Sequence, residues 1–356
     1  MIKIITRRTN DLSYFTNDQA LELEGIRDGA PGWWLRGDGD LENPQVLKDV
    51  LQTSQRSHIY GYDIIVAAPR TSSLLIAVDE EQAPGVIAAH RESVRAAFSY
   101  FEERALVTRV RRGGDDYDVA ATWQSVASFT HGINRHGEPH LHDHLIVGAR
   151  PNGTYLVLDS MALRAHSIAA DAVYRASLRF EIAERTTWQP WRSYQGIEHV
   201  CGLDEGFREL WGGRHQDRGE KLQPTRNEIV TKWSNDLERL QRLGNVIAPP
   251  RRTVLNEHAF QSAFEGMHGV TRRDVVAAWA NAAESGQSYN SLRRAVEHFY
   301  GAGDERGIRE EVQSVAEVRM IAEVSRRGAR PLEMEQMERW HQRDRSRSVA
   351  EVGLSR

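Results

Sequence analysis

The sequence predicts an α+β fold, in which an antiparallel β-sheet is flanked by helices and is followed by a helical, Arg/Glu-rich C-terminal region. Three observations support this prediction. Short apolar segments typical of strands alternate with amphipathic helices, turn residues separate two of the strands, and strand formers become rare beyond residue 248.

The predicted strands are short segments rich in apolar, β-branched and aromatic residues. They cover residues 2–6, 60–68, 72–78, 122–131 and 140–148. Apolar residues recur at helical spacing in two longer segments, residues 85–106 and 167–186, and a short helix is predicted around Tyr14 and Phe15. Residues 132–139 contain Gly, Asn and Pro, so they are predicted to form a turn between two strands.

The composition predicts two regions. Residues 1–248 would form the α+β domain and residues 249–356 a helical C-terminal region, because the composition shifts at the Pro249-Pro250 pair. The last stretch, residues 343–356, is polar and Arg/Ser-rich and is expected to be frayed. The chain has no G-x-x-x-x-G-K-[ST] motif, so a helicase-type P-loop is not expected in it.

Several features bear on the location of the protein. No run approaches the ~18 consecutive apolar residues of a membrane span, so membrane insertion is not expected. The N-terminus lacks the apolar run and cleavage site of a signal peptide. The single cysteine, Cys201, rules out an intrachain disulfide and fits a reducing compartment. Together these features predict a cytoplasmic protein.

The charge of the chain gives a mixed indication about nucleic acids. A formal net charge of -4 argues mildly against nucleic-acid binding, although the distribution of charge matters more than its sum. Of the 46 basic residues only four are lysines, and arginine offers a planar fork for phosphate and guanine. A codon bias towards arginine is the alternative explanation. Trp33 and Trp34 are candidates for stacking on unpaired bases, with a core role as the alternative.

Five of the 14 histidines fall within residues 129–148. His142 and His144 lie two apart on a predicted strand and therefore face the same side, and His140 joins them by the same parity. His131 lies on the preceding strand, and the turn brings it alongside. Three neutral imidazoles from two strands are typical of a catalytic metal site with open coordination positions. The spacing leaves open whether the ligands are 140/142/144 or 131/142/144, and an H-x-H-x-H run on an edge strand can also be adventitious.

This segment resembles the histidine motif of the TrwC/TraI-like relaxases of conjugative plasmids, which belong to the HUH nuclease superfamily. The family motif is a histidine, a turn with Ser/Asn-Arg, then Pro-x-Leu-His-x-His and an apolar strand. The corresponding positions here are His131, Asn134-Arg135, Pro139, Leu141, His142 and His144. The resemblance selects His131, His142 and His144 as metal ligands and leaves His136 and His140 as bystanders.

Further blocks resemble the same family in the same order. Residues 61–73 resemble its G-x-D-L-T-F-S-A-P-K-S-V-S segment, and residues 173–181 resemble its Y-R-x-x-L-x-x-E helix. Ser13-Tyr14 corresponds to the place of its nucleophilic tyrosine. The chain departs from the family where Phe15 follows Tyr14, which puts a second nucleophilic tyrosine in doubt, and where Arg70 replaces the usual lysine.

The resemblance implies a metal-dependent DNA strand transferase with an HUH-type, palm-like sheet. Tyr14 would be the nucleophile, forming a 5′-phosphotyrosine and a free 3′-hydroxyl. Asp63 would orient a metal-binding imidazole or help remove the tyrosine proton. Arg135 and Arg70 would contact DNA phosphates. The expected cofactor is a divalent ion, Mg²⁺ or Mn²⁺ first and Zn²⁺ as an alternative. The expected partners are single-stranded or hairpin origin-of-transfer DNA, accessory DNA-binding proteins and a conjugation coupling protein.

Three other functions compete with this interpretation. A rolling-circle replication initiator of the same superfamily would perform the same chemistry at a replication origin. A metal-dependent hydrolase would use water, with Asp63 or Glu138 as the base, and would leave no covalent adduct with DNA. A DNA-binding protein with a relict site would bind without cleaving.

Overall fold

The computed structural model describes residues 1–300, apart from 13–14, 16–31, 40, 42, 44, 47–49, 52–57, 135, 152–155, 194, 204–225, 242–254 and 268. Residues 1–263 and the helices from Thr271 onward belong to one compact unit, and Phe264–Val270 belong to a second one. Within this described part, no helix is long and apolar enough to cross a membrane. The predicted boundary at residue 248 falls outside the described residues.

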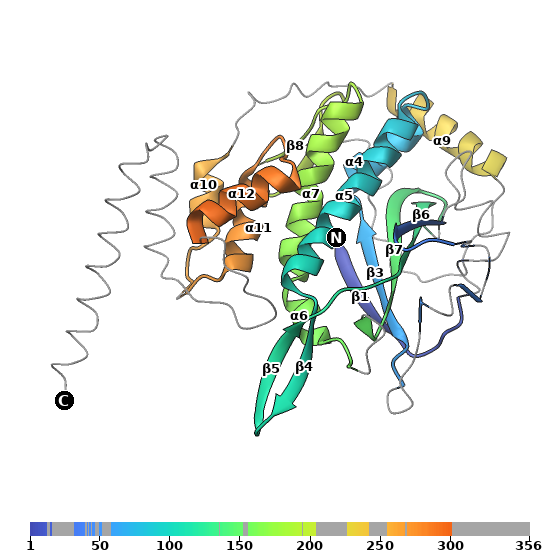
Figure 1. Ribbon diagram of the computed structural model, residues 1–356. Helices are drawn as coiled ribbons and strands as arrows, with labels where there is room; N and C mark the ends of the chain where they lie inside the picture. Colours follow the sequence, from blue (N-terminus) through green and yellow to red (C-terminus); the bar gives the residue numbers. More distant parts are fainter. Residues whose placement is uncertain are drawn as a thin grey trace. The chain divides into compact units, whose positions relative to one another are not determined.

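A five-stranded sheet in the order β1-β3-β7-β6-β2 forms the centre of the first unit (Figure 1), and all its neighbouring strands are antiparallel. This confirms the predicted fold class. Gly61, on β3, lies so close to the neighbouring strand that a Cβ there would be 2.1 Å from the carbonyl oxygen of Val147. The five strands are β1 (Ile2–Arg7), β2 (Gly32–Arg36), β3 (Gly61–Ala67), β6 (Val126–Ile133) and β7 (Pro139–Gly148).

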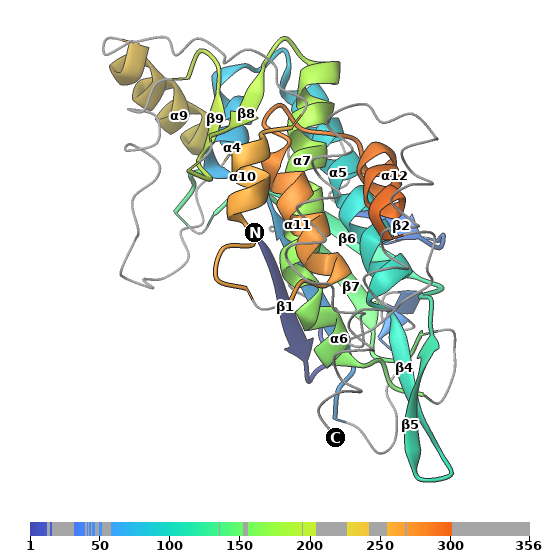
Figure 2. The same ribbon diagram turned by 90° about the vertical axis from the view of Figure 1, so that its left-hand side faces the viewer.

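Two long helices, α5 (Ala83–Arg104) and α7 (Ser167–Arg185), pack against each other and cover one face of the sheet (Figure 2). Their buried residues recur at helical spacing, as the sequence predicts. On the other face, an apolar cluster packs against β6 and β7. Its buried members are Leu12, Phe15, Leu51, Ala127, Phe129 and Ile146. The sheet therefore has one face against helices and one face shared between this cluster and polar residues.

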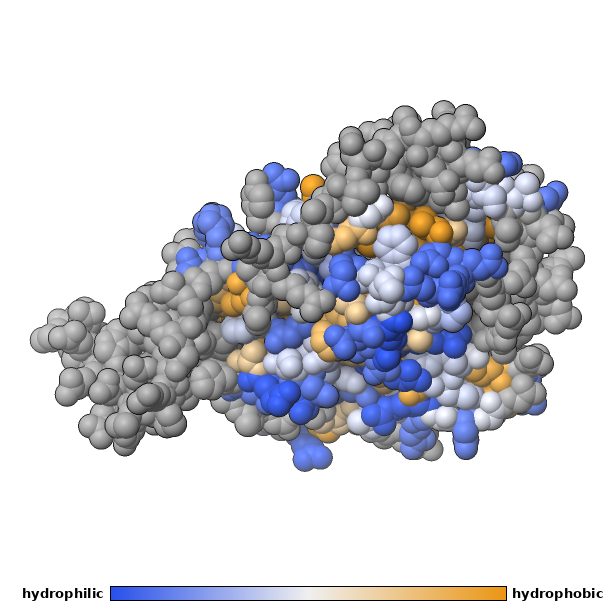
Figure 3. All heavy atoms as spheres, turned by 90° about the horizontal axis from the view of Figure 1, so that it is seen from above, coloured by the Kyte–Doolittle hydropathy of each residue, from blue (hydrophilic) through white to orange (hydrophobic). Residues whose placement is uncertain are grey.

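Smaller elements surround this core. A hairpin of β4 (Val107–Arg112) and β5 (Asp115–Ala120) extends away from the sheet (Figure 1). On the face shown in Figure 3, hydrophilic side chains dominate and apolar ones form a few small areas. The remaining elements are α4 (Arg70–Val78), α6 (Ser160–Ala165), β8 (Pro190–Arg192), β9 (Glu198–Val200), α9 (Arg226–Gln241), α10 (Glu257–Ser262), α11 (Arg272–Ala282) and α12 (Tyr289–Tyr300).

The strand predicted at residues 72–78 is wrong, because these residues belong to helix α4. A short apolar run such as Leu74-Leu75-Ile76 fits a buried strand and a buried helix equally well. Pro69 adopts φ −52° and ψ 145° immediately before the helix, and its carbonyl oxygen accepts the Ser73 N–H at 3.0 Å. The other predicted strands and both long helices are confirmed, although β6 begins four residues later than expected. Strands β2, β4, β5, β8 and β9 were not predicted.

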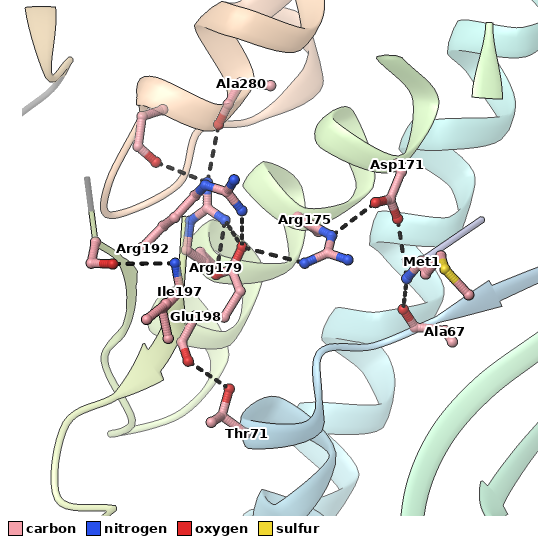
Figure 4. Close-up of polar contacts among 12 residues, drawn as sticks. Met1, Ala67, Thr71, Asp171, Arg175, Arg179, Arg192, Ile197, Glu198 and Ala280 are labelled. Carbon is pink, nitrogen blue, oxygen red and sulfur yellow. Dashed lines mark hydrogen bonds and ion pairs between the residues drawn. The ribbon is translucent and has the colours of Figure 1, made fainter. Parts of the chain in front are cut away.

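A buried ion pair between Arg179 and Glu198 joins three parts of the unit (Figure 4). The Arg179 Nη1 of α7 donates to the two carboxylate oxygens of Glu198 on β9, at 2.8 and 3.0 Å. Its Nη2 donates to the carbonyl oxygens of Ala280 and Ala283 at the end of α11, at 3.0 Å each. Since a buried charge needs a partner, this pair fixes β9 and α11 against α7.

We expect Glu198→Gln to lower the free energy of unfolding by about 3–5 kcal/mol, because it leaves the buried Arg179 charge uncompensated. Equilibrium denaturation followed by circular dichroism measures the loss. Glu181→Gln is the matched control, since its partner Arg185 lies 2.9 Å away with a side chain that is 40% exposed. That change should cost at most about 1 kcal/mol. Equal losses in the two variants would contradict the role given to the buried pair.

Candidate metal centre

Three histidines come together on the sheet face opposite α5 and α7. His131 on β6 is paired directly with His142 on β7, and His144 follows two residues later on the same face. Their metal-binding atoms all lie within 4.8 Å of one another. The ring centroids are 5.1 Å apart for His131 and His142, 5.0 Å for His131 and His144, and 5.3 Å for His142 and His144. In the described part of the chain this is the one such group of three or more possible ligands.

Hydrogen bonds orient two of these imidazoles. The Nδ1 of His144 donates to the carboxylate of Asp63, at 2.9 and 3.0 Å, and the Nδ1 of His142 donates to the carbonyl oxygen of His140 at 2.8 Å. Each ring therefore keeps Nε2 for a metal ion, as metal-binding histidines commonly do. Burial, and then the neighbouring His131, His140 and His144, lowers the pKa of His142 well below its ordinary value. A neutral imidazole is the form that binds metal, so this donor set fits a divalent ion.

The remaining predicted site residues lie at different distances from the centre. Asp63, on β3, contacts His144 directly. Arg70, at the start of α4, forms an ion pair with the buried Glu138 at 3.2 Å. His140 packs beside His142, with ring centroids 4.8 Å apart. Tyr14 and Arg135 lie outside the described residues.

The turn that joins β6 and β7 is fixed on both sides of residue 135. Asn134 accepts the backbone N–H groups of His136 and Glu138, at 2.9 and 3.1 Å, and donates to the Glu138 carboxylate at 2.7 Å. From helix α9, Lys232 and Trp233 donate to backbone carbonyl oxygens of the turn, at 3.2 and 2.9 Å. These contacts hold β6 and β7 in the register that brings the histidines together.

Phe15, the residue after Tyr14, packs on the metal centre. Its ring stacks on Phe129 with centroids 5.0 Å apart, and it lies 5.2 Å from the ring of His144 and 6.4 Å from that of His131. The Phe15 N–H donates to the carbonyl oxygen of Leu12 at 2.8 Å, and both residues belong to the apolar cluster beside the site. Both ends of the segment 12–15 are thus held against the site.

A hydrogen-bond network that no sequence motif indicates surrounds Asp143, which lies between His142 and His144 but points to the helix layer. Its carboxylate accepts the Nε2–H of His90 at 3.0 Å, the Ser128 hydroxyl at 2.6 Å and the Trp33 indole N–H at 3.0 Å. Burial opposes the charge of Asp143, but His90 and the hydrogen bonds from Ser128 and Thr130 outweigh it and hold the pKa of Asp143 below its ordinary value. The network therefore anchors the backbone of β7 directly behind the histidines.

The same network accounts for Trp33. Besides the bond to Asp143, its indole N–H lies 3.1 Å from the Thr130 hydroxyl, and the Arg95 guanidinium lies over the ring at 4.6 Å. Trp34, whose side chain points the other way, packs against the apolar cluster. These contacts within the protein favour the core role for both tryptophans over stacking on bases.

Comparison with known proteins identifies the family. The family model described as TrwC relaxase matches residues 34–243, more than half of the chain. The chain belongs to the TrwC relaxase family. The resemblance to TrwC/TraI-like relaxases that the sequence motifs predict is therefore confirmed.

Individual relatives of this TrwC-family chain are distant. It is 28% identical over 140 residues to the multifunctional conjugation protein TraI of Escherichia coli, and the match covers 36% of this chain but only 8% of that protein. Its fold is similar to that of TrwC complexed with a 27-mer DNA comprising the recognition hairpin and the cleavage site (TM-score 0.52, 18% identity), and to that of metal-bound TrwC in complex with oriT DNA (TM-score 0.53, 18% identity). Each match covers 68% of this chain and 99% of the other.

We expect that His131→Ala, His142→Ala and His144→Ala each weaken the binding of Mn²⁺, measured by calorimetry. The affinity should fall by at least ~10–100-fold, which is the loss when a residue that only supports a metal ligand is removed. Circular dichroism should show that the variants remain folded. His140→Ala and His136→Ala are the matched controls and should bind nearly as the wild type does. If His140→Ala lost the metal and His131→Ala kept it, the ligand set would be 140/142/144 instead.

Proposed function

We propose that this chain nicks one strand of an origin-type DNA and becomes covalently attached to it through Tyr14. One observation carries the assignment of the nucleophile: Phe15 packs against the rings of His131 and His144. Chain connectivity keeps the Cα of residue 14 about 3.8 Å from that of Phe15. The position of Phe15 next to these histidines supports Tyr14, its neighbour in the chain, as the nucleophile.

The proposed reaction is a transesterification at phosphorus. The phenolic oxygen of Tyr14 attacks the phosphorus, the bond from phosphorus to the 3′-oxygen breaks, and that oxygen takes up a proton to become a free 3′-hydroxyl. The product is a 5′-phosphotyrosine diester. Because the diester keeps the energy of the broken bond, attack by a 3′-hydroxyl can rejoin strands without ATP.

The residues of the site would have different roles in this reaction. His131, His142 and His144 would hold a divalent ion, which when bound supplies Lewis-acid polarisation of the phosphate. Free tyrosine has a pKa of ~10, so Tyr14 must lose its proton with help from its surroundings. The hydrogen bonds of Asp63 to His144 support an orienting role for this carboxylate, with proton removal as the alternative.

We propose single-stranded or hairpin origin-of-transfer DNA as the substrate, in line with the oriT DNA bound in the related TrwC structures. Arg135, which follows Asn134 in the sequence between β6 and β7, would contact DNA phosphate. A phosphate contact by Arg70 would have to replace its ion pair with Glu138. The proposed protein partners are accessory DNA-binding proteins and a coupling protein, the proposed location is the cytoplasm, and the proposed metal is Mg²⁺ or Mn²⁺. We also propose that the chain divides into a relaxase domain at 1–248 and a C-terminal region at 249–356.

A rolling-circle replication initiator is the second candidate, because it would use the same residues in the same way. The two differ in the DNA that is cut, so mapping the nicked strand and site to a transfer or a replication origin separates them. A hydrolase that uses water would cut DNA without leaving it bound to protein.

We expect Tyr14→Phe to abolish the covalent adduct while DNA binding and stability stay close to those of the wild type, because only the phenolic oxygen is removed. The assay incubates protein with a single-stranded origin oligonucleotide and Mn²⁺ and resolves the adduct on a denaturing gel. Phe15→Tyr in the wild-type protein is a second variant for the same assay, since it adds a phenol at the residue after Tyr14. An adduct that mass spectrometry assigns to Tyr60 or Tyr62, or wild-type cleavage by Tyr14→Phe, would refute this nucleophile.

Binding should favour single-stranded or hairpin DNA over random duplex, because the nucleophile must reach an exposed phosphate. Fluorescence anisotropy at several salt concentrations measures the affinities. Arginine contacts to phosphates predict that the logarithm of the binding constant falls linearly with the logarithm of salt, with a slope of about −0.7 per phosphate for single strands. Equal affinity for single strand and random duplex would count against the proposed substrate.

A further inference from the structure

Arg7, the last residue of β1, lies on the same sheet face as the metal centre. On β1, Ile5 is paired with Asp63 of β3, and Arg7 follows Ile5 by two residues, so its side chain is on the same side. Asp63 in turn binds His144. Arg7 is therefore placed beside the residues of the site, although the sequence motifs gave no reason to select it.

The guanidinium of Arg7 contacts both ends of the segment that contains Tyr14. Its Nη2 donates to the carbonyl oxygen of Asp11, and its Cζ lies over the ring of Phe15, 5.6 Å from the centroid. Between these two contacts, the Phe15 N–H donates to the carbonyl oxygen of Leu12. One side chain thus holds the segment 11–15 before and after the proposed nucleophile.

The charge of Arg7 also interacts with Asp63, a residue of the metal centre. Burial lowers the pKa of Arg7, and the negative charges of Asp63 and Asp11 offset part of that effect. Arginine titrates so far above neutral pH that its side chain remains charged. The Nε atom of Arg7 is buried and has no hydrogen-bond partner among the described residues. The side chain is thus held by Asp11, Phe15 and the charge of Asp63.

We propose that Arg7 is a positioning residue for strand transfer, which clamps Asp11 and Phe15 on either side of the proposed nucleophile Tyr14. The inference rests on the proposed function, because the clamp affects the reaction only if Tyr14 is the nucleophile. Arginine suits this task, since its planar group donates to a carbonyl oxygen and stacks on a ring at the same time. A displacement of reacting groups by 1 Å can cost ~100-fold in rate.

The test compares Arg7→Met with Arg8→Met. Methionine keeps an unbranched apolar stem but removes the charge and the donors, and Arg8 is an exposed neighbour that serves as the matched control. Adduct formation is measured at increasing concentrations of a single-stranded origin oligonucleotide with Mn²⁺. We expect the maximal rate of Arg7→Met to fall by about 10–100-fold with an unchanged half-saturating DNA concentration and unchanged Mn²⁺ affinity. Arg8→Met should keep the maximal rate of the wild type.

Hydrogen–deuterium exchange without DNA provides a readout that does not depend on activity. Peptides that cover residues 8–16 should exchange faster in Arg7→Met than in the wild type and in Arg8→Met. Arg7→Gln serves as a second variant if methionine lowers the melting temperature. Arg7→Lys, which keeps the charge without the planar fork, should recover the rate only in part.

The outcomes separate the clamp from the proposed function. A wild-type maximal rate in Arg7→Met, full recovery in Arg7→Lys, or a higher half-saturating DNA concentration with an unchanged maximal rate would each overturn the clamp. A wild-type protein that forms no adduct would overturn the proposed function. Faster exchange in Arg7→Met would in that case still support the contact of Arg7 with the segment, and unchanged exchange would refute it.

Discussion

Asp143 carries a negative charge in the middle of the sheet, at a position that solvent does not reach. A carboxylate there must be compensated, and α5, β6 and β2 each supply it with a hydrogen-bond donor. His90, which donates from α5, also accepts the hydroxyl of Tyr174 on α7 at 2.6 Å. One buried charge therefore fixes the helix layer, an inner strand and an edge strand relative to β7.

The alternation of side chains along β7 connects this buried network to the metal centre. Asp143 points to the helices, and its neighbours His142 and His144 point to the opposite face. A shift of β7 by one residue would bury imidazoles against the helices and bring the carboxylate to the metal face. The requirement to satisfy Asp143 thus selects the register in which the histidines converge with His131.

Helix α7 connects the buried network of Asp143 with the buried ion pair of Arg179 and Glu198. Tyr174 extends the Asp143 network, and five residues later Arg179 binds Glu198 and the last carbonyl oxygens of α11. Arg179 acts there as a cation at the end of a helix, where it satisfies carbonyl groups that have no partner within α11. The helices beyond Thr271 are in this way attached to the layer that supports the sheet from behind.

Local periodicity in the sequence determined the larger part of the fold. Segments rich in apolar and β-branched residues placed β1, β3, β6 and β7, and helical patterns placed α5 and α7. The alternation of side chains along a strand put His142 and His144 on one face, and the relaxase motif pointed to the family. Residues 72–78 form a segment that is too short and too uniformly apolar for periodicity to decide between a strand and a helix. In the structure this segment is helical and packs against β7 and α5.

Only the tertiary structure decided which distant residues meet. Ser128, His90 and Trp33 donate to Asp143 from 15, 53 and 110 residues away along the chain. Asp11 and Phe15 contact Arg7 through a carbonyl oxygen and a ring face, and no sequence motif indicates these contacts. His140 shares the parity of His142 and His144, yet His131 lies directly opposite His142 because strand pairing brings it there. A sequence pattern states which face a residue occupies, whereas the neighbours on that face depend on the register between strands and on which charges must be satisfied when the layers close.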